Sequence, residues 1–378
     1  MKKLEKDGTL LMKSKVNFAH PLTVTDFHVL VRYIKENYAD IDRSYYPQIL
    51  LSGAVSVVLS PFRFFEKLLY SRKEAGCTIK RPLFILGHWR SGTTLVQQMM
   101  AQDSQFGFIN PLMNFTLNFY HLLGWAFEKV ISDHLKDGRP MDNMEYAMNL
   151  PLEEYIVFST IEENSVYPLN FFPQAFLKYN ENAFIDKMPF DRRRKWCKKY
   201  DCLLKKITFL NDHKSLLLKS PDNTARLAAL LRMYPDAKFV NIYRNPYDVI
   251  RSTIHLYEMI MDNWALEKIP SRNTMEDWII ETFRNMYLAY FEEMKSCGSD
   301  NLYEICFEEF EKDPLPIMEE LYQKLDLGGY DQAKDAIAQY WTDRTDYKKN
   351  SFDISEQLIL KVNSRLGFYF EHYGYTMR

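Results

Sequence analysis

The sequence has few of the features that mark secreted, nucleic-acid-binding or repeat proteins. Its five cysteines, at positions 77, 197, 202, 297 and 306, form neither a zinc spacing nor a convincing disulfide set, which fits a reducing, cytoplasmic compartment. A formal net charge of −2 over 378 residues argues against broad nucleic-acid binding. No internal repeat or low-complexity segment occurs. We expect one globular unit, with residues 1–80 as an N-terminal helical segment packed on a domain of residues 81–378.

Long apolar runs are also scarce. The N-terminus carries charge, but no apolar core of a signal peptide follows it. Residues Ile49–Leu59 are apolar, with interruptions at Ser52, Gly53 and Ser56, and Pro61 closes the run. It is well short of the roughly 20 residues that a helix needs to cross a bilayer. We expect a buried helix here, and an interfacial helix is the alternative.

The most informative stretch is a phosphate loop without its lysine. Leu83–Leu86 is typical of a short buried strand, and Gly87 and Gly92 follow at the spacing of the pattern G-x-x-x-x-G-K-[ST]. Thr93 stands where that pattern has its lysine, and the only cation in the loop is Arg90. Backbone N–H groups and the start of the next helix still favour an anion. We therefore expect a nucleotide with a short 5′ anionic group, and an ordinary tight turn is the alternative.

Two further apolar strands are predicted to end in cations. Lys219 closes the run Leu216–Lys219, and Arg244 follows the run Ala237–Tyr243. Ligands of open α/β sheets bind at the carboxyl ends of the strands, so both cations and Arg90 are expected to face one anion. No obvious metal-binding carboxylate stands at these strand ends, and we expect no metal. A surface lysine and an ordinary surface arginine are the alternatives.

Helical patterns follow each of these strands, with apolar residues at i, i+3, i+4 and i+7. The alternation predicts an α/β protein with a three-layer, P-loop-like fold. In this fold a central parallel sheet is flanked by helices, and helical insertions are added.

Together the three motifs resemble the signature set of sulfotransferases, which use 3′-phosphoadenosine 5′-phosphosulfate (PAPS) as donor. The matching stretches are Gly87–Leu95, Leu218–Pro221 and Tyr243–Pro246, with Ser252 eight residues after Arg244. The resemblance implies that PAPS is the co-substrate. It implies that the 5′-phosphosulfate is bound by Arg90, Ser91, Gly92, Thr93 and Thr94, and that the 3′-phosphate is bound by Arg244 and Ser252. It also implies that Lys219 approaches the transferred sulfuryl group.

The chain departs from the best-known cytosolic branch of that family. That branch has a lysine at the position of Arg90 and a catalytic histidine just after the lysine that Lys219 matches, where this chain has Ser220. The branch with Arg-Ser-Gly-Thr-Thr is largely bacterial, and its members show a stretch like Arg139–Asn143 followed by Pro-Leu-Glu-Glu. The general base must therefore come from elsewhere in this chain.

Matching the Pro-Leu-Glu-Glu stretch makes Glu153 the first candidate for the general base, with Glu154 close behind. Removing the proton of an alcohol as sulfur is attacked typically contributes ~10²- to 10⁴-fold. Apolar neighbours favour burial, which raises the pKa of a carboxyl group. Alternatively, both glutamates simply open a helix, where acidic side chains suit the dipole. His88, His121 and His255 are rival bases, and His88 can instead orient the ligand from within the loop.

Apolar and aromatic side chains crowd residues 106–184, and few lysines or arginines lie among them. Such residues build apolar ligand pockets, so we expect a small hydrophobic alcohol as acceptor, a sterol or a related lipid alcohol. A carbohydrate or glycolipid acceptor is the alternative. Two other classes are a P-loop kinase, which Thr93 opposes, and a non-catalytic nucleotide- or membrane-binding protein, which would not explain three spaced motifs.

Two polar stretches complete the analysis. The basic cluster Arg192–Lys195 with Lys198 and Lys199 is interpreted as a solvated helix face, and a peripheral membrane contact or an anion patch is the alternative. The segment from Arg344 to Ser351 is of the kind that closes over PAPS in related enzymes. Lys348, Lys349 or Asn350 would then contact the nucleotide, and a plain linker is equally compatible with the sequence.

Overall fold

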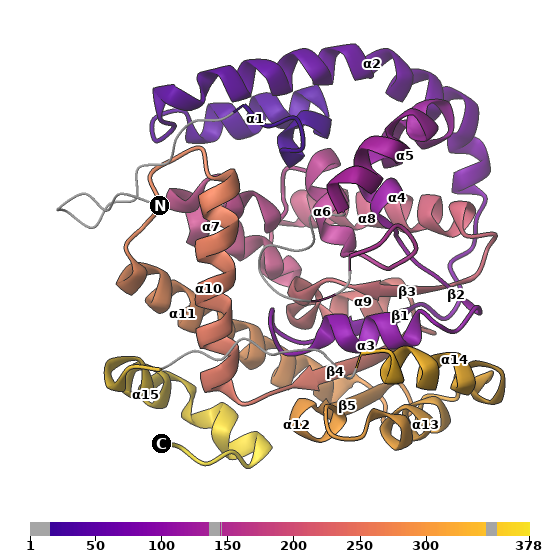
Figure 1. The fold of residues 1–378 in the computed structure, drawn as a ribbon, viewed down its shortest axis with the longest axis vertical. Coiled ribbons are helices and arrows are strands. Elements are labelled where there is room, and N and C mark those ends of the chain that lie inside the picture. The colour runs from indigo at the N-terminus through magenta and orange to yellow at the C-terminus, as the bar shows by residue number, and fades with distance from the viewer. Residues whose placement is uncertain (1–15, 136–143, 145, 345–353) are drawn as a thin grey trace.

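The computed structural model describes residues 16–135, 144, 146–344 and 354–378 (Figure 1). Its centre is a 5-stranded sheet in the order β2-β3-β1-β4-β5, and every neighbouring pair is parallel. The strands are β1 (Leu83–Leu86), β2 (Phe106–Gly107), β3 (Ser215–Lys219), β4 (Lys238–Tyr243) and β5 (Leu302–Cys306). Because β1 lies between β3 and β4, the loops that follow these three strands meet at one edge of the sheet. The predicted parallel α/β fold is confirmed.

The helices of the described residues fall into an N-terminal group, insertions between the strands and a C-terminal group. They are α1 (Phe27–Asn37), α2 (Tyr46–Ala75), α3 (Thr93–Met100), α4 (Pro111–Thr116), α5 (Tyr120–Leu135), α6 (Glu154–Ile161), α7 (Phe176–Asn180), α8 (Phe190–Leu210), α9 (Leu227–Met233), α10 (Pro246–Trp264), α11 (Arg272–Glu293), α12 (Phe307–Phe310), α13 (Pro314–Lys324), α14 (Tyr330–Thr342) and α15 (Glu356–Tyr373).

The strands send alternate side chains into two apolar cores, because successive residues of a strand point to opposite faces. Phe84 and Leu86 belong to the larger core, which includes residues of α1, α6, α8, α9, α10, α11 and α15. Leu83 and Ile85 belong to the smaller core, which includes residues of α3, α12, α13 and α14. Helices therefore cover both faces of the sheet, as the three-layer prediction requires.

Helix α2 differs from its prediction in length and burial. It runs for 30 residues straight through Pro61, and it lies along the top of the molecule in Figure 1. Pro61 removes the backbone hydrogen bond to the carbonyl of Val57. The carbonyl of the preceding Ser56 accepts from two side chains, Ser60 Oγ at 2.8 Å and Arg63 Nη1 at 3.1 Å. Much of its apolar surface is exposed, with Leu50 at 72%. The predictions that Pro61 ends this helix and that the helix is buried were wrong.

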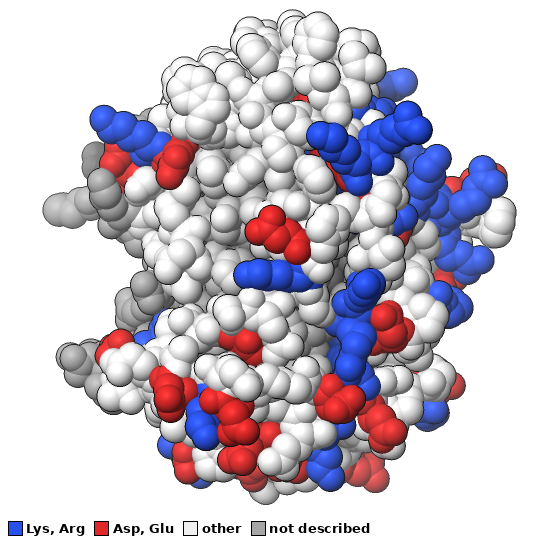
Figure 2. Space-filling view, turned by 90° about the vertical axis from the view of Figure 1, so that its right-hand side faces the viewer, with Lys and Arg blue, Asp and Glu red and all other residues white. Residues whose placement is uncertain are grey.

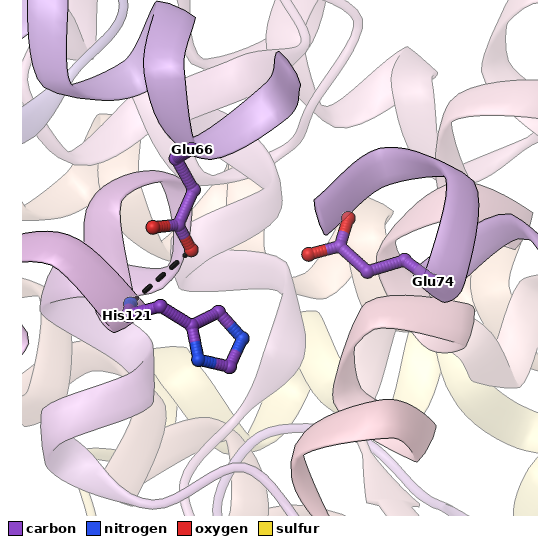
Figure 3. Close-up of side chains that lie close together, drawn as sticks. All are labelled: Glu66, Glu74 and His121. Carbon is purple, nitrogen blue, oxygen red and sulfur yellow. Dashed lines mark hydrogen bonds between the residues drawn. The ribbon is translucent and has the colours of Figure 1, made fainter. Parts of the chain in front are cut away.

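The C-terminal half of α2 is anchored by a polar cluster. Glu66 and Glu74 of α2 and His121 of α5 present potential ligand atoms within 4.8 Å of one another (Figure 3). Lys206 of α8 pairs with both carboxylates, at 3.0 Å and 3.2 Å, and the backbone N–H of His121 donates to Glu66 at 3.2 Å. Because the Lys206 ammonium already supplies positive charge between the carboxylates, we interpret the cluster as a structural anchor.

The basic cluster lies on the first turns of α8, and several of its side chains hold the chain that follows α6. Arg192 donates to Asn164 Oδ1 at 3.0 Å, and Lys199 donates to the carbonyl of Ile161. Lys195 pairs with Glu163. These contacts support the interpretation of a helix face rather than of an anion-binding patch.

Glu267 makes the stability of the fold depend on pH. Its side chain is buried, Oε2 accepts from the N–H of Gln174 at 2.9 Å, and Oε1 has no hydrogen-bond partner among the described residues. Burial raises the pKa of this carboxyl group from 4.5 to about 7. Between these values the unfolded chain releases a proton that the folded chain keeps, so stability falls as the pH rises through this window and then levels off.

We therefore expect Glu267→Gln to raise the melting temperature more at pH 8 than at pH 5, because the amide never has to ionise in the buried site. Thermal unfolding of both proteins at the two pH values measures the difference. An equal gain at both pH values would show that the ionisation of Glu267 has no part in it.

Candidate active site

The loop after β1 is held close to its neighbours. Gly87 and Gly92 have φ values of +131° and +104°, in the region that glycine favours. A Cβ atom at Gly92 would lie 2.1 Å from the ring of Phe307, and one at Gly87 would lie 2.6 Å from the carbonyl oxygen of Ile242. Any other residue at Gly87 or Gly92 would strain the backbone and collide with a neighbouring atom, so glycine is required at both positions. The loop and the start of α3 present Arg90, Gly92, Thr93, Thr94 and Leu95 to a cavity.

Two arginines and a serine converge beside this loop. Arg90 Nε donates to Ser252 Oγ of α10 at 2.9 Å, and Arg244 Nη1 donates to the carbonyl oxygen of Arg90 at 3.2 Å. The guanidinium of Arg244 lies 4.4 Å above the ring of Phe307, and its Nε is buried without a hydrogen-bond partner among the described residues. An orphaned, charged donor in a concave site suits a phosphate oxygen. The structure thus brings Arg90, Arg244 and Ser252 together, as the sequence analysis predicted.

At the end of β3, Lys219 lies between the loop and the start of α6. It is 3% exposed, its Nζ donates to Thr94 Oγ1 at 3.3 Å, and it forms an ion pair with Glu153. The parallel register of β1 and β3 sets Lys219 beside Ile85, which brings the lysine to the phosphate loop. Glu153, Lys219 and Thr94 all line the cavity.

Glu154 has a different environment from its neighbour Glu153. Its side chain is fully buried, where Oε1 accepts from Tyr200 Oη and Asn223 Nδ2, each at 2.9 Å, and Oε2 accepts from the N–H of Lys219 at 3.1 Å. Burial raises the pKa of Glu154. Glu154 is not among the cavity-lining residues, so the geometry gives it a positioning role at the end of β3 and leaves Glu153 facing the cavity.

None of the three histidines lines the cavity. His88 is buried, its Nδ1 lies 2.9 Å from the carbonyl oxygen of Trp89, and burial lowers its pKa to about 4, so the ring is neutral near pH 7. His121 belongs to the anchor beneath α2, and His255 lies on α10. Ser91 is likewise buried, with Oγ packed where a Cβ of Gly87 would be. Two predicted segments, Arg139–Asn143 and the one with Lys348, Lys349 and Asn350, lie outside the described residues.

The cavity has a volume of about 700 Å³, within the range of ligand pockets. One end carries the charged groups described above. The other end is apolar, and its walls come mainly from α6, α10 and the chain between α6 and α7: Leu152, Tyr155, Ile156, Tyr167, Leu256, Met259, Ile260 and Trp264. Asn17, Ala19 and Pro21 also line it. A charged ligand and an apolar ligand would therefore fit into this cavity end to end.

Several lining residues were missed or only partly foreseen by the sequence analysis. Tyr155 belongs to the aromatic stretch 106–184 that was expected to build an apolar pocket, and it lines the cavity with its hydroxyl accepting from Trp89 Nε1 at 3.4 Å. Phe307 follows β5, a strand that the analysis did not predict, so no local signal pointed to it. Arg344 opens the polar segment that was expected to close over the donor, and it lines the cavity and donates to Gln98 Oε1 at 3.3 Å.

The contact between Gly92 and Phe307 gives a direct test of the loop. We expect Gly92→Ala to destabilise the protein by about 2 kcal/mol or more, because the methyl group meets an aromatic ring and the positive φ disfavours alanine. Thermal unfolding measures this loss. Gly53→Ala on α2 is the matched control, since a Cβ there meets nothing within 4 Å. Equal effects of the two changes would contradict this account of the loop.

Comparisons with known sequences find related proteins. The profile of the sulfotransferase family matches residues 82–332. A curated relative, omega-hydroxy-beta-dihydromenaquinone-9 sulfotransferase Stf3 of Mycobacterium bovis, is 27% identical over 360 residues, which cover 95% of this chain and 92% of the relative. The Stf3 protein of Mycobacterium tuberculosis matches to the same extent.

Two solved structures share the fold. Sulfotransferase STF9 from Mycobacterium avium superposes with a TM-score of 0.69 at 14% identity, covering 94% of this chain and 98% of that one. Sulfotransferase STF1 from Mycobacterium tuberculosis gives a TM-score of 0.65 at 18% identity, covering 89% and 90%.

Proposed function

The chain belongs to the sulfotransferase family, and on that premise we propose that it transfers the sulfuryl group of PAPS to the hydroxyl of a lipid alcohol. One observation carries the proposal. A single cavity joins a cationic end, built by Arg90, Lys219 and Arg244, to an apolar end built by α6 and α10. The cationic end suits the donor, and the apolar end suits the acceptor.

The residues at the cationic end fit the donor. Arg244, whose Nε is an unsatisfied buried donor, would hold the 3′-phosphate together with Ser252. Arg90, Thr93 and Thr94, with the backbone of the loop, would hold the 5′-phosphosulfate. The two phosphate subsites are connected directly, because Arg90 Nε of one donates a hydrogen bond to Ser252 Oγ of the other. The donor supplies an activated sulfuryl group, and the protein supplies alignment and charge.

Glu153 is the general base of this proposal. It reaches the cavity between the loop and the apolar wall, with its side chain 19% exposed. As the acceptor oxygen bonds to sulfur, the bond from sulfur to the 5′-phosphate oxygen breaks, and the hydroxyl proton passes to Glu153. The nucleotide leaves as adenosine 3′,5′-bisphosphate.

Lys219 would interact first with Glu153 and then with the leaving phosphate of the donor. It now pairs with Glu153 and donates to Thr94 Oγ1. Developing negative charge on the leaving phosphate oxygen attracts the ammonium toward the loop, and this movement would release a Glu153 oxygen to accept the hydroxyl proton. Because Glu154 fixes the backbone of Lys219, only the flexible side chain has to move.

Three observations support an apolar acceptor. The wall opposite the loop is formed by aliphatic and aromatic side chains. The relative Stf3 is named for a menaquinone derivative that bears a hydroxyl group. In addition, half of the eight residues of the apolar wall (Leu152, Tyr155, Ile156 and Tyr167) come from the part of the chain where the sequence has few cations. We also propose a cytoplasmic location, which the five free cysteines support.

The two adjacent glutamates provide a matched pair of variants. We expect Glu153→Gln to lower kcat by ~10²-fold or more, because a general base is lost, with little change in nucleotide affinity. Its melting temperature should also fall, because the buried Lys219 loses its charged partner. Glu154→Gln is the matched neighbour and should lower the melting temperature, because its NH2 group would face a donor in either orientation, the N–H of Lys219 or the side-chain NH2 of Asn223. Turnover and thermal unfolding of both variants check this. A fully active Glu153→Gln enzyme would exclude Glu153 as the base.

Donor binding is tested by calorimetric titration of the metal-free protein with adenosine 3′,5′-bisphosphate. We expect binding in the wild type and a loss of ~10-fold or more in Arg244→Ala, because a charge-assisted hydrogen bond of this kind contributes ~1.5–3 kcal/mol. Arg251→Ala on α10 is the control, since Arg251 pairs with Asp248 at 3.0 Å and is not a cavity-lining residue. Wild-type protein that fails to bind this nucleotide would refute PAPS as the donor.

The acceptor is tested with a panel of alcohols and labelled PAPS. The panel contains prenyl alcohols of increasing chain length, a sterol and a soluble sugar. We expect transfer to the apolar alcohols, with kcat/KM rising with apolar length until the cavity is filled, because each buried methylene adds ~0.8 kcal/mol. Transfer to the sugar alone would replace the lipid acceptor with a carbohydrate.

A further inference from the structure

Helix α2 carries polar residues on its inner face and apolar residues on its outer face. Gln48, Ser52, Ser56 and Glu66 are among its buried residues. The outer face exposes more than half of each of seven large apolar side chains: Leu50, Val57, Val58, Phe64, Phe65, Leu68 and Leu69. A surface helix of a soluble protein normally has the opposite arrangement. The outer face of α2 therefore resembles a surface that meets an apolar medium.

These seven residues, which we call the apolar stripe, lie on one side of the helix because they are separated mostly by one, three, four or seven positions. From Leu50 to Leu69 the stripe is about 28 Å long at 1.5 Å per residue. Figure 2 shows the corresponding top of the molecule as a nearly uncharged cap. A contiguous exposed apolar surface of this kind marks an interaction site.

The charges of α2 indicate which partner fits. Both of its glutamates turn inward, with Glu66 at 1% and Glu74 at 14% side-chain exposure, and both pair with Lys206. Its exposed charged residues are Lys67, Arg72 and Lys73, all basic. Figure 2 shows Lys and Arg gathered just below the uncharged cap. An anionic lipid surface complements such charges, whereas α2 exposes no acidic side chain that could pair with the basic residues of a second copy.

We propose that α2 lies flat on an anionic bilayer, with the apolar stripe buried at the boundary between headgroups and acyl chains. Arg43–Ala75 also has the length and apolar composition to cross a membrane. Its inner face argues for lying on the surface, because Arg63 pairs with Asp26 at 3.1 Å and Ser56 Oγ donates to the carbonyl of Thr25 at 2.7 Å. A spanning helix would have to break these contacts and bury Glu66 in lipid.

The N-terminal end of α2 lies next to a residue of the cavity wall. Gln48 of α2 accepts from the N–H of Asn17 at 2.7 Å, and Asn17 lines the cavity. Val16 and Phe18, which flank Asn17, are 51% and 72% exposed. Exposed apolar side chains therefore flank the cavity wall beside the N-terminal end of α2. If the proposed function holds, on which this step rests, a lipid alcohol passes from the bilayer to Glu153 without crossing water.

Vesicle sedimentation of the full chain tests the docking surface without any assay of transfer. We expect the wild type to sediment with vesicles of phosphatidylglycerol and phosphatidylcholine, and more weakly with pure phosphatidylcholine. Leu68→Asp should reduce the bound fraction at least tenfold on the mixed vesicles. Leu360→Asp on α15 is the matched control, because Leu360 is 68% exposed and Leu68 is 65% exposed, and it should bind like the wild type.

Lys73→Glu gives a second variant that leaves the apolar stripe intact. It should weaken binding to the mixed vesicles and leave binding to pure phosphatidylcholine unchanged. Equal sedimentation of wild type and Leu68→Asp would overturn the proposal. So would a dimer in light scattering that Leu68→Asp dissociates, since the stripe would then bind a second copy.

Activity assays separate this proposal from the proposed function. Leu68→Asp should lose at least tenfold in rate on a long-chain alcohol embedded in vesicles and keep the wild-type rate on a short soluble alcohol. Equal rates for the two proteins on the embedded alcohol would overturn the delivery of acceptor from the bilayer. If the wild type transfers sulfate to neither alcohol, the proposed function fails, and sedimentation still decides whether α2 binds lipid.

Discussion

The charge on Lys219 is the constraint around which the active end of the cavity is arranged. A buried ammonium is costly unless it is paired, and here it meets the Glu153 carboxylate while its own backbone is held by Glu154. The same pair of glutamates opens α6, so the ion pair fixes the start of that helix against the end of β3. The apolar wall that continues from α6 is thereby placed next to the phosphate loop.

Close backbone packing provides the rest of the anion site. Gly92 lets the loop lie directly on the ring of Phe307. The guanidinium of Arg244 also packs on this ring. Arg244 in turn bonds the carbonyl of Arg90, whose side chain bonds Ser252. A phosphate that moved any one of these side chains would therefore also shift the side chains hydrogen-bonded to it. This coupling suits an enzyme that must align two substrates before a single transfer step.

Helix α2 combines a polar inner face that anchors it to the protein with an apolar outer face. The inner face of α2 is joined to the body of the protein through polar contacts, which include the buried pair of Glu66 with Lys206. Directional contacts of this kind hold the helix with little apolar area, because Leu59 is its one buried aliphatic residue, and most of its aliphatic and aromatic side chains remain on the outside. The division explains how a helix with a long apolar sequence remains on the surface of a folded domain.

The sequence by itself determined the parts that depend on neighbouring residues. The glycine spacing of the loop, the cations at the ends of three strands and the parallel α/β pattern follow from local conformation and from alternation, and the structure contains all of them. Tertiary structure decided which of two adjacent glutamates faces the cavity, because successive residues of a helix point about 100° apart and only packing fixes the rotation. It also placed Phe307, which comes from a distant strand, beside Gly92. The outward orientation of the apolar residues of α2 was likewise decided by packing, because polar partners on α5, α8 and the chain before α1 hold its inner face.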